Sequence, residues 1–379
     1  MIIAGVPMTT QPAHGSNGSS HDTIIIGAGQ AGLALGYFLQ RQARQFLIVE
    51  AAKVPGAAWL ERWESLKLFT PARFSGLPGL AIPGDPDEHP PRDEVASYLR
   101  RYARHFELPL ATGNAVLELQ QREHGYLART ATSAYEARQV VIATGPFQTA
   151  SVPAWADELA SEVHQIHAQQ YRTPRDITPG RALVVGGGNT GYQIAEELAA
   201  SREVHLSVGS RQKPLPQRVL GRDVFWYLDK AGVMRKSVDT RLGHRLQGRD
   251  TLIGSSPRTI RKKGVTLHPR AMGAQGATVE FEDGEQLPVD TVVWATGYRP
   301  DFSWVKVPVL TPEGAPIHHR GVTDAPGLYF LGLTWMYTRG SALIGWVKDD
   351  AQFIADQIDA FDSPASPSMG KPSVARRSQ

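Results

Sequence analysis

The sequence of 379 residues contains no cysteine. Without thiols the chain can form no disulfide, no thiolate metal site and no redox-active dithiol. It also lacks a hydrophobic run near the roughly 18 residues that a membrane-spanning helix needs. The first 20 residues contain no charged segment followed by an apolar one, so we expect no signal peptide. The absence of cysteine does not fix the compartment, whereas the absence of a signal peptide and of a membrane span leads us to expect a cytoplasmic protein that does not enter a membrane.

Net charge is also low, since the formal value is only +3. Basic residues are spread along the chain except at residues 258–263, so we expect no nucleic-acid surface. Charged residues make up 20% of the sequence and hydrophobic residues 41%, which is ordinary for a globular protein. The length predicts two or three domains. We expect residues 1–20 to form a disordered arm and residues 363–379 a disordered tail.

A glycine-rich loop occurs twice, each time after a short apolar strand and before a predicted helix. The first copy follows residues 23–26 and contains Gly27, Gly29, Gln30, Ala31 and Gly32. The second copy follows residues 182–185 and contains Gly186, Gly188, Asn189, Thr190 and Gly191. In such a loop the first glycine forms a tight turn, the second lets the backbone approach a pyrophosphate, and the third lets the helix pack on its strand. One copy is a weak signal, but two copies in this context predict two bound dinucleotides.

The residue that ends the second strand of each unit predicts which dinucleotide binds there. Glu50 ends the strand over residues 46–50, at 50 − 27 = 23 positions after the first glycine, where a carboxylate can accept hydrogen bonds from a ribose. The same offset in the second unit reaches Gly209, which is followed by Ser210 and Arg211. This hydroxyl and two cations, Arg211 and Lys213, suit a 2′-phosphate. We therefore predict FAD at the first loop and NADPH at the second, with NADH as the alternative if Arg211 lies in a solvated loop.

Two further apolar strands end in the same tripeptide, Ala-Thr-Gly. Residues 143–145 follow one strand and residues 295–297 follow the other. Small residues let the backbone pass close to a bound cofactor where the chain crosses between domains. The alternative is that each strand is simply buried and ends at a glycine turn. Together with the two loops, the repeat favours cofactor contacts by Ala143, Thr144, Gly145, Thr296 and Gly297.

These repeats predict an α/β fold with two dinucleotide-binding, Rossmann-like domains. We expect residues 21–150 and 295–362 to form the FAD-binding domain in two parts. The NAD(P)H-binding domain, residues 151–294, is expected to be inserted between those parts.

Beyond the loops, the sequence resembles the flavin-containing monooxygenases, in particular their compact bacterial branch and the plant auxin-synthesis monooxygenases. The similarity covers residues 23–358 and rests on GAGQAG, PGAAW, LKLFTP, LPG, VIATGP, VVGGGNTG, VVWATGYRPD and GLYFLG. It implies an FAD-dependent, NAD(P)H-using monooxygenase that forms a hydroperoxyflavin. That species would oxygenate a small soft nucleophile, such as a sulfide or an amine, or a ketone. The implied partners are a small-molecule substrate and O2, and a homodimer is left open.

The segment that follows Glu50 is expected to form the floor of the flavin site, because its small residues can admit the edge of the ring. The residues expected to contact FAD are Gly56, Ala58, Trp59, Leu66, Leu68 and Thr70, with Val116 near the adenine. The alternative is that Trp59, Trp63, Leu66 and Phe69 form a plain core cluster. Near the C-terminus, the resemblance implies that Ser341, Leu343 and Ile344 open a helix from residue 340 toward residue 358. The N-terminus of that helix would point at the flavin pyrimidine ring.

The identifying stretch of the family is only half present in this chain. His167 and Tyr171 match it, whereas Ser161 and Val163 stand where a phenylalanine and a glycine are expected. These departures favour the alternative of an NAD(P)H-dependent oxidoreductase that passes electrons to a small acceptor or a partner protein. Leu333, where reductase relatives usually carry an aspartate, favours the monooxygenase. A nucleotide-sensing regulator is the third alternative, and two intact sites disfavour it.

We identify no catalytic side chain and no metal site. No serine–histidine–aspartate or paired-carboxylate arrangement stands out, which suits an enzyme whose cofactor carries the reaction. His164 and His167 are three residues apart, a spacing that can bind zinc on a helix, but no third ligand lies nearby. We expect residues 318–320 to be a polar loop.

Overall fold

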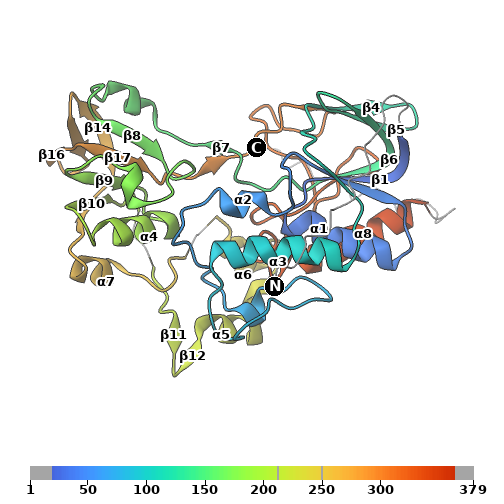
Figure 1. The fold of residues 1–379 in the computed structure, drawn as a ribbon, viewed down its shortest axis with the longest axis horizontal. Coiled ribbons are helices and arrows are strands. Elements are labelled where there is room, and N and C mark those ends of the chain that lie inside the picture. Colours follow the sequence, from blue (N-terminus) through green and yellow to red (C-terminus); the bar gives the residue numbers. More distant parts are fainter. Residues whose placement is uncertain (1–18, 211–212, 249–250, 363–379) are drawn as a thin grey trace, which may run out of the picture.

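The computed structural model describes residues 19–210, 213–248 and 251–362. These residues form two lobes, each built around its own sheet (Figure 1). The predicted α/β fold with two Rossmann-like units is confirmed. None of the helices described is long and apolar enough to cross a membrane.

The first lobe contains an eight-stranded sheet with β1 near its centre. In spatial order its strands are Val305–Lys306 (β19), Glu118–Arg122 (β4), Gly125–Arg129 (β5), Ala134–Ile142 (β6), Ser19–Ile26 (β1), Phe46–Glu50 (β2) and Leu110–Thr112 (β3), with Leu328–Phe330 (β20) beside β6. β1 runs parallel to β2 and β6, whereas β4, β5 and β6 form an antiparallel meander. Ile24 and Ile25 are fully buried, as expected for an apolar strand that is covered on both faces.

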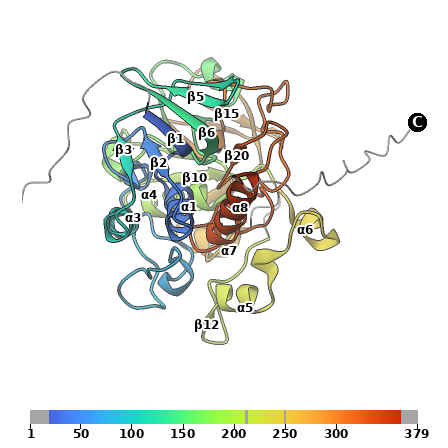
Figure 2. The same cartoon turned by 90° about the vertical axis from the view of Figure 1, so that its right-hand side faces the viewer.

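Helix α1, from near the start of the described chain, and helix α8, from its end, lie side by side and cover the first sheet (Figure 2). The helices of this lobe are Gln30–Arg41 (α1), Ala57–Leu60 (α2), Arg92–His105 (α3) and Val347–Asp362 (α8), with a 3₁₀ turn at Ala72–Phe74 (η1). The predicted order of strand, glycine loop, helix and strand over residues 23–50 is confirmed.

The second lobe contains a five-stranded parallel sheet with β9 at its centre. In spatial order its strands are Thr266–His268 (β13), Val204–Ser207 (β10), Ala182–Val185 (β9), Thr291–Trp294 (β17) and His164–His167 (β8). Helix α4 (Asn189–Leu198) packs on one face through Ile194 and Leu198. A three-stranded antiparallel sheet packs on the other face through Val279 and Phe281. The remaining elements are Ala271–Gln275 (β14), Thr278–Phe281 (β15), Gln286–Pro288 (β16), Pro257–Lys262 (α7), Ala154–Glu158 (η2) and Pro174–Asp176 (η3).

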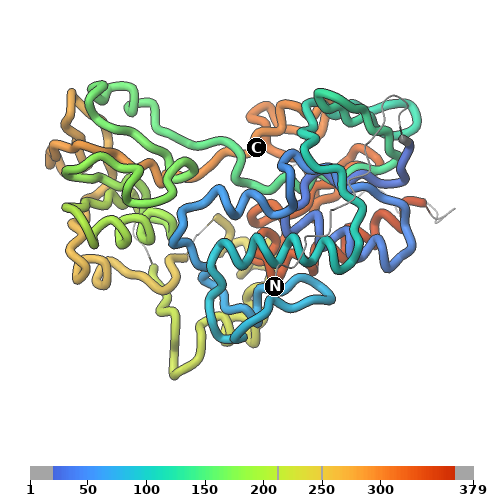
Figure 3. Tube along the Cα trace, viewed as in Figure 1, coloured from blue at the N-terminus to red at the C-terminus, as the bar shows by residue number. Residues whose placement is uncertain are grey.

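The chain passes between the lobes along two short strands that pair with each other. Thr149–Ala150 (β7) leaves the first lobe and Tyr298–Arg299 (β18) returns to it, and they are antiparallel. Figure 3 shows these green and orange segments next to each other in the middle of the molecule. The pairing holds the two Ala-Thr-Gly tripeptides close to the boundary between the sheets.

A segment of the second lobe, residues 213–248, also reaches the first lobe at the bottom of Figure 1. It contains Arg218–Val219 (β11), Arg222–Asp223 (β12), Val224–Lys230 (α5), Val233–Arg235 (η4) and Arg241–Leu246 (α6). We call residues 213–248 the bridging segment. Its Val238 N–H donates to the Tyr337 carbonyl at 2.8 Å, and Gln217 Nε2 donates to the Phe69 carbonyl at 3.0 Å.

Candidate active site

The first glycine loop has the geometry that each of its glycines requires. Gly27 has a φ of +111°, and a Cβ there would lie 2.6 Å from the Ala143 carbonyl oxygen. A Cβ at Gly32 would overlap the Gly27 carbonyl, so α1 can lie against the loop only because position 32 is glycine. A Cβ at Gly29 would meet no atom within 4 Å, and no side chain caps the helix that begins at Gln30. The start of α1 therefore offers uncapped N–H groups and open space, which fits a pyrophosphate.

The second loop repeats this geometry. Gly186 has a φ of +131°, and a Cβ there would overlap the Ala295 carbonyl, while a Cβ at Gly191 would overlap the Gly186 carbonyl. A Cβ at Gly188 would meet no atom within 4 Å, and α4 has no side-chain cap.

Two of the predicted residues of the second loop lie at the start of α4. The Asn189 side chain bonds the Thr251 carbonyl at 3.1 Å and the Ile253 N–H at 2.9 Å, so it holds the chain beyond the bridging segment. Thr190 lies next to it in the first turn of the helix, half-buried. The second loop thus also fits a pyrophosphate.

The two sites differ at the ends of their second strands. The Glu50 carboxylate accepts hydrogen bonds from Ala28 N at 2.5 Å and from Ala52 N at 2.8 Å, which places it against the first loop. The second site has no carboxylate at the matching position. The predicted counterpart Gly209 lies one residue too far along, because Ile26 pairs with Val49 and Val185 with Ser207, so Val208 corresponds to Glu50 and the exposed Gly209 and Ser210 follow it. Arg211, the predicted cation, lies outside the described residues. Arg270, which the sequence analysis did not single out, bonds to the Gly209 carbonyl at 2.9 Å.

Both Ala-Thr-Gly tripeptides touch the glycine loop of their own lobe. Ala143 N donates to the Ile26 carbonyl, and Ala295 N donates to the Val185 carbonyl, both at 2.8 Å. The hydroxyls of the two threonines point to the chain that crosses between the lobes. Thr144 Oγ1 accepts from Gln148 Nε2 at 2.9 Å, and Thr296 Oγ1 donates to the Ser151 carbonyl. Gly145 and Gly297 have φ values of +74° and +88°, a conformation that favours glycine where the chain turns toward the crossing strands.

The segment expected to lie under the flavin starts at the first glycine loop. Gly56 N donates to the Ala28 carbonyl at 3.2 Å, and Ala58 follows in the short helix α2. The Thr70 hydroxyl lies 2.8 Å from Ser75 Oγ, and both side chains are buried. Val116 packs on the core of the first lobe, just after Asn114, whose N–H bonds the Glu50 carbonyl at 2.9 Å.

Trp59, Trp63, Leu66 and Phe69 all pack on hydrophobic cores, as the core alternative expects, but they do not form one cluster. Trp59 packs on the core of the first lobe, as Leu68 does, whereas Trp63 and Leu66 pack on the core of the second lobe. Phe69 contacts a third cluster, formed with the bridging segment. The segment therefore spans the boundary between the lobes, where a flavin and a nicotinamide would have to meet.

The predicted helix start at residue 340 is wrong, because α8 begins only at Val347. Residues 340–346 form turns instead. The Ser341 hydroxyl accepts the N–H groups of Tyr337 and Thr338 at 3.1 and 2.9 Å, which stabilises the turn. A Cβ at Gly345 would overlap the Phe74 carbonyl, so this turn is pressed against the first lobe.

These turns lie beside the start of α1. Gln30 Nε2 donates to the Ala342 carbonyl at 3.4 Å. Ile344 is buried in the core of the first lobe, and Leu343 packs on the cluster of the bridging segment.

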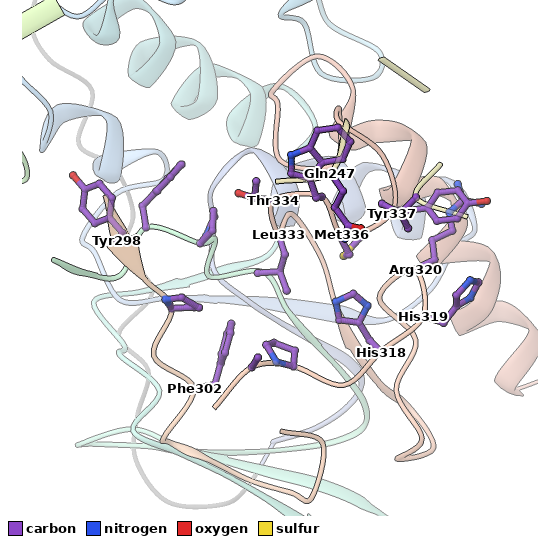
Figure 4. Close-up of a pocket in the computed structure, with 17 residues that line it drawn as sticks. Gln247, Tyr298, Phe302, His318, His319, Arg320, Leu333, Thr334, Met336 and Tyr337 are labelled. Atoms are coloured by element: carbon purple, nitrogen blue, oxygen red, sulfur yellow. The ribbon is translucent and has the colours of Figure 1, made fainter. Parts of the chain in front are cut away.

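A cavity of about 630 Å³ opens beside the crossing strands (Figure 4). Its wall includes Pro146 and Tyr298, each of which directly follows one of the two tripeptides in the sequence. It also includes Leu333, whose neighbour Gly332 lies against Ala31 of α1. Most of the other lining side chains are apolar or aromatic, and the polar ones are Gln247, His318, His319, Arg320 and Thr334. Residues 318–320 were expected to be a polar loop, and they form one side of this cavity.

Trp335 is the most unusual residue of the cavity wall. Its φ is +55°, and its buried indole N–H has no hydrogen-bond partner among the described residues. A strained backbone and an unsatisfied buried donor are costly, and such features concentrate at binding sites.

An aromatic and cationic cluster lies where the chain crosses between the lobes. The Arg62 guanidinium lies 5.5 Å from the Phe147 ring centre and 5.0 Å from that of Tyr298, and it donates to the Tyr298 hydroxyl. His167 Nε2 lies 3.1 Å from the Gly297 carbonyl oxygen, and its ring centre is 5.1 Å from that of Tyr298. Burial raises the pKa of Tyr298 and lowers the pKa of His167. The histidine retained from the family stretch thus contacts the second Ala-Thr-Gly tripeptide.

Tyr171, the other retained residue, is fully buried and donates to Glu197 Oε2 of α4 at 2.6 Å. It therefore fixes the helix of the second glycine loop against the preceding chain.

Two buried histidines should lower the free energy of unfolding at acid pH. Burial lowers the pKa of both His167 and His205 from the ordinary value of 6.5. The folded protein then keeps these rings neutral, while the unfolded chain binds protons near pH 6.5, so stability is full above that pH and falls as the pH drops below it. We expect the free energy of unfolding in urea to decrease from neutral pH to about pH 5. The slope should be shallower in a His205→Gln variant, and an equally steep slope there would contradict this assignment.

The helical spacing that could let His164 and His167 bind zinc does not arise, because both residues lie on strand β8. Residues three apart on a strand point to opposite faces. Within residues 19–210, 213–248 and 251–362, no group of three histidine or acidic side chains is placed to hold a metal ion.

Known proteins resemble this chain over most of its length. The family model of the pyridine nucleotide-disulphide oxidoreductases matches residues 24–220. An uncharacterized CzcO-like oxidoreductase of Geobacillus kaustophilus is 43% identical over 340 residues, covering 89% of this chain and 98% of the relative. The probable indole-3-pyruvate monooxygenase YUCCA7 of Arabidopsis thaliana is 28% identical over 381 residues, covering 88% and 86% of the two chains.

A solved structure extends the likeness to three dimensions. The flavin-containing monooxygenase from Stenotrophomonas maltophilia has a TM-score of 0.77 and 29% sequence identity, covering 91% of this chain and 99% of the other. The family model covers more than half of the present chain, and its two glycine loops have the geometry that such enzymes require. The chain therefore belongs to the pyridine nucleotide-disulphide oxidoreductase family, and it is similar to flavin-containing monooxygenases in sequence and in fold.

Proposed function

We propose that this chain is an NADPH-dependent FAD monooxygenase that transfers one oxygen atom from O2 to a small soft nucleophile, such as a sulfide or an amine, or to a ketone. The observation that carries the proposal is the open space at Gly29 and Gly188, each at the start of an uncapped helix. Two such sites in one chain suit a nicotinamide and the flavin that it reduces. Because the chain has no cysteine, it contains no dithiol to which the reduced flavin could pass its electrons.

The described residues supply binding and orientation in this proposal. The first loop would hold FAD, with Glu50 at its ribose, and the second loop would hold NADPH, with Ser210 near its ribose. Bound FAD would supply the redox chemistry. The crossing strands, and the segment from Trp63 to Phe69 that spans both cores, would fix the distance between the two sites and help to exclude water.

The cavity beside the crossing strands supports a small and largely apolar substrate. Phe147, Tyr298, Phe302, Met336 and Tyr337 supply its apolar and aromatic surface. Aromatic walls bind apolar ligands and leave orientation to a few polar groups. A sulfide or an amine with an apolar substituent fits this chemistry better than a highly charged substrate does.

The second candidate is an NAD(P)H-dependent oxidoreductase that passes electrons to a small acceptor or a partner protein. Ser161 and Val163, which depart from the family stretch, favour it. It needs the same two cofactors, so only the fate of the electrons separates it from a monooxygenase.

The stoichiometry of turnover tests the proposal. FAD-loaded protein would be given NADPH with thioanisole, benzylamine or cyclohexanone as test substrates, and NADPH oxidation, O2 uptake and oxygenated product would be followed together. We expect equal amounts of the three for at least one substrate class. The oxidoreductase is the correct function if no test substrate gives a product and if a quinone, under anaerobic conditions, supports NADPH oxidation as rapid as that measured with O2.

A further inference from the structure

The space that a side chain would occupy at Gly209 is filled by an arginine from the neighbouring strand. β13 runs parallel to β10, with Ser207 opposite His268, so Arg270 lies just beyond the edge where β10 ends. Its Nη2 donates to the Gly209 carbonyl at 2.9 Å. A Cβ built at Gly209 would lie 3.1 Å from the Arg270 Cζ. The guanidinium therefore lies over Gly209, one residue beyond Val208, which the strand register makes the counterpart of Glu50 in the first site.

The charge of this guanidinium is not neutralised by a neighbour. Within the part of the chain that the structure describes, no carboxylate forms an ion pair with Arg270, and the side chain is exposed. A guanidinium has five N–H donors in a planar fork, and the bond to Gly209 uses only one of them. The two dinucleotide sites thus carry opposite charges near the ends of their second strands.

We infer that Arg270 is the residue that recognises the 2′-phosphate and makes the second site select NADPH over NADH. In a Rossmann unit the end of the second strand lies at the adenine ribose, where an acid accepts from the 2′-hydroxyl and a cation instead binds a 2′-phosphate. Arg270 reaches this point from the next strand, because Gly209 leaves room for it. The inference rests on the proposed function only in that the second loop binds a nicotinamide dinucleotide.

The test measures binding to the oxidised FAD-loaded protein, with no turnover. Calorimetry would compare 2′,5′-ADP, which carries the 2′-phosphate, with 5′-AMP, which lacks it. Arg270→Ala should weaken 2′,5′-ADP by about 10- to 100-fold, as expected for the loss of a charge-assisted hydrogen bond, and should leave 5′-AMP nearly unchanged. Arg258→Ala, which removes another exposed arginine of the same lobe, is the matched control and should change neither.

Gly209→Asp provides an independent variant. The nearest atoms to its new Cβ belong to the flexible end of Arg270, so the fold should tolerate it. We expect it to weaken 2′,5′-ADP and NADP⁺ and to spare or strengthen NAD⁺.

The inference would be overturned if the ratio of 2′,5′-ADP to 5′-AMP affinity is unchanged in Arg270→Ala. It would also be overturned if Arg258→Ala loses as much 2′,5′-ADP affinity as Arg270→Ala does. A wild-type protein that binds neither ligand would overturn both this inference and the assignment of the second loop. Arginine-dependent binding in a protein that oxygenates no substrate would leave the inference standing and refute only the monooxygenase.

Discussion

A Gly29→Val variant is expected to fold normally and to purify without flavin. A Cβ at Gly29 meets no protein atom within 4 Å, so the added side chain displaces nothing in the folded chain. It fills the space at the start of α1 where the pyrophosphate must approach the backbone N–H groups. Losing two charge-assisted hydrogen bonds of about 1.5–3 kcal/mol each would weaken FAD binding by at least about 100-fold.

Flavin absorbance per mole of purified protein, together with circular dichroism, measures this effect. Gly32→Val is the informative comparison, because its Cβ would overlap the Gly27 carbonyl. We expect that variant to lose stability as well as flavin. A yellow Gly29→Val protein with a full complement of FAD would show that the first loop does not bind the flavin pyrophosphate.

The second large effect is expected at the other loop. Gly188→Val should purify with its flavin and fail to be reduced by NADPH, because the same open space at the start of α4 is filled. At NADPH concentrations below the dissociation constant, the rate of flavin reduction should fall by at least about 100-fold, by the same count of lost hydrogen bonds.

Anaerobic stopped-flow absorbance would follow the reduction, and dithionite, which needs no nucleotide site, is the control reductant. We expect dithionite to reduce the variant and the wild type alike. Normal reduction of the Gly188→Val flavin by NADPH would show that the second loop does not bind the nicotinamide dinucleotide.

The third glycine of each loop could be predicted from the sequence because it acts on atoms within a few residues. Gly32 contacts the Gly27 carbonyl, and Gly191 contacts the Gly186 carbonyl, so a local pattern contains the whole requirement. The Ala-Thr-Gly tripeptides could be found for a different reason, since their strands lie next to β1 and β9 and therefore end beside the loops.

Contacts between distant segments could not be predicted in the same way. The start of α8 was misplaced because Gly345 packs on the Phe74 backbone, which no local pattern reveals. Leu66 packs on the second core although it lies in the sequence of the first lobe. Arg270 was missed because its contact with Gly209 spans 61 positions. The domain limits after residues 150 and 294 stay a prediction.

Isotope labelling tests the central claim most directly. FAD-loaded protein would turn over NADPH with thioanisole, benzylamine or cyclohexanone in separate reactions under O2 labelled with a heavy oxygen isotope, and mass spectrometry would follow the label. The account predicts one labelled oxygen atom in each sulfoxide formed and the other in water, with NADPH consumed in equal amount. Label recovered only as hydrogen peroxide, with no labelled product from the sulfide, the amine or the ketone, would contradict it.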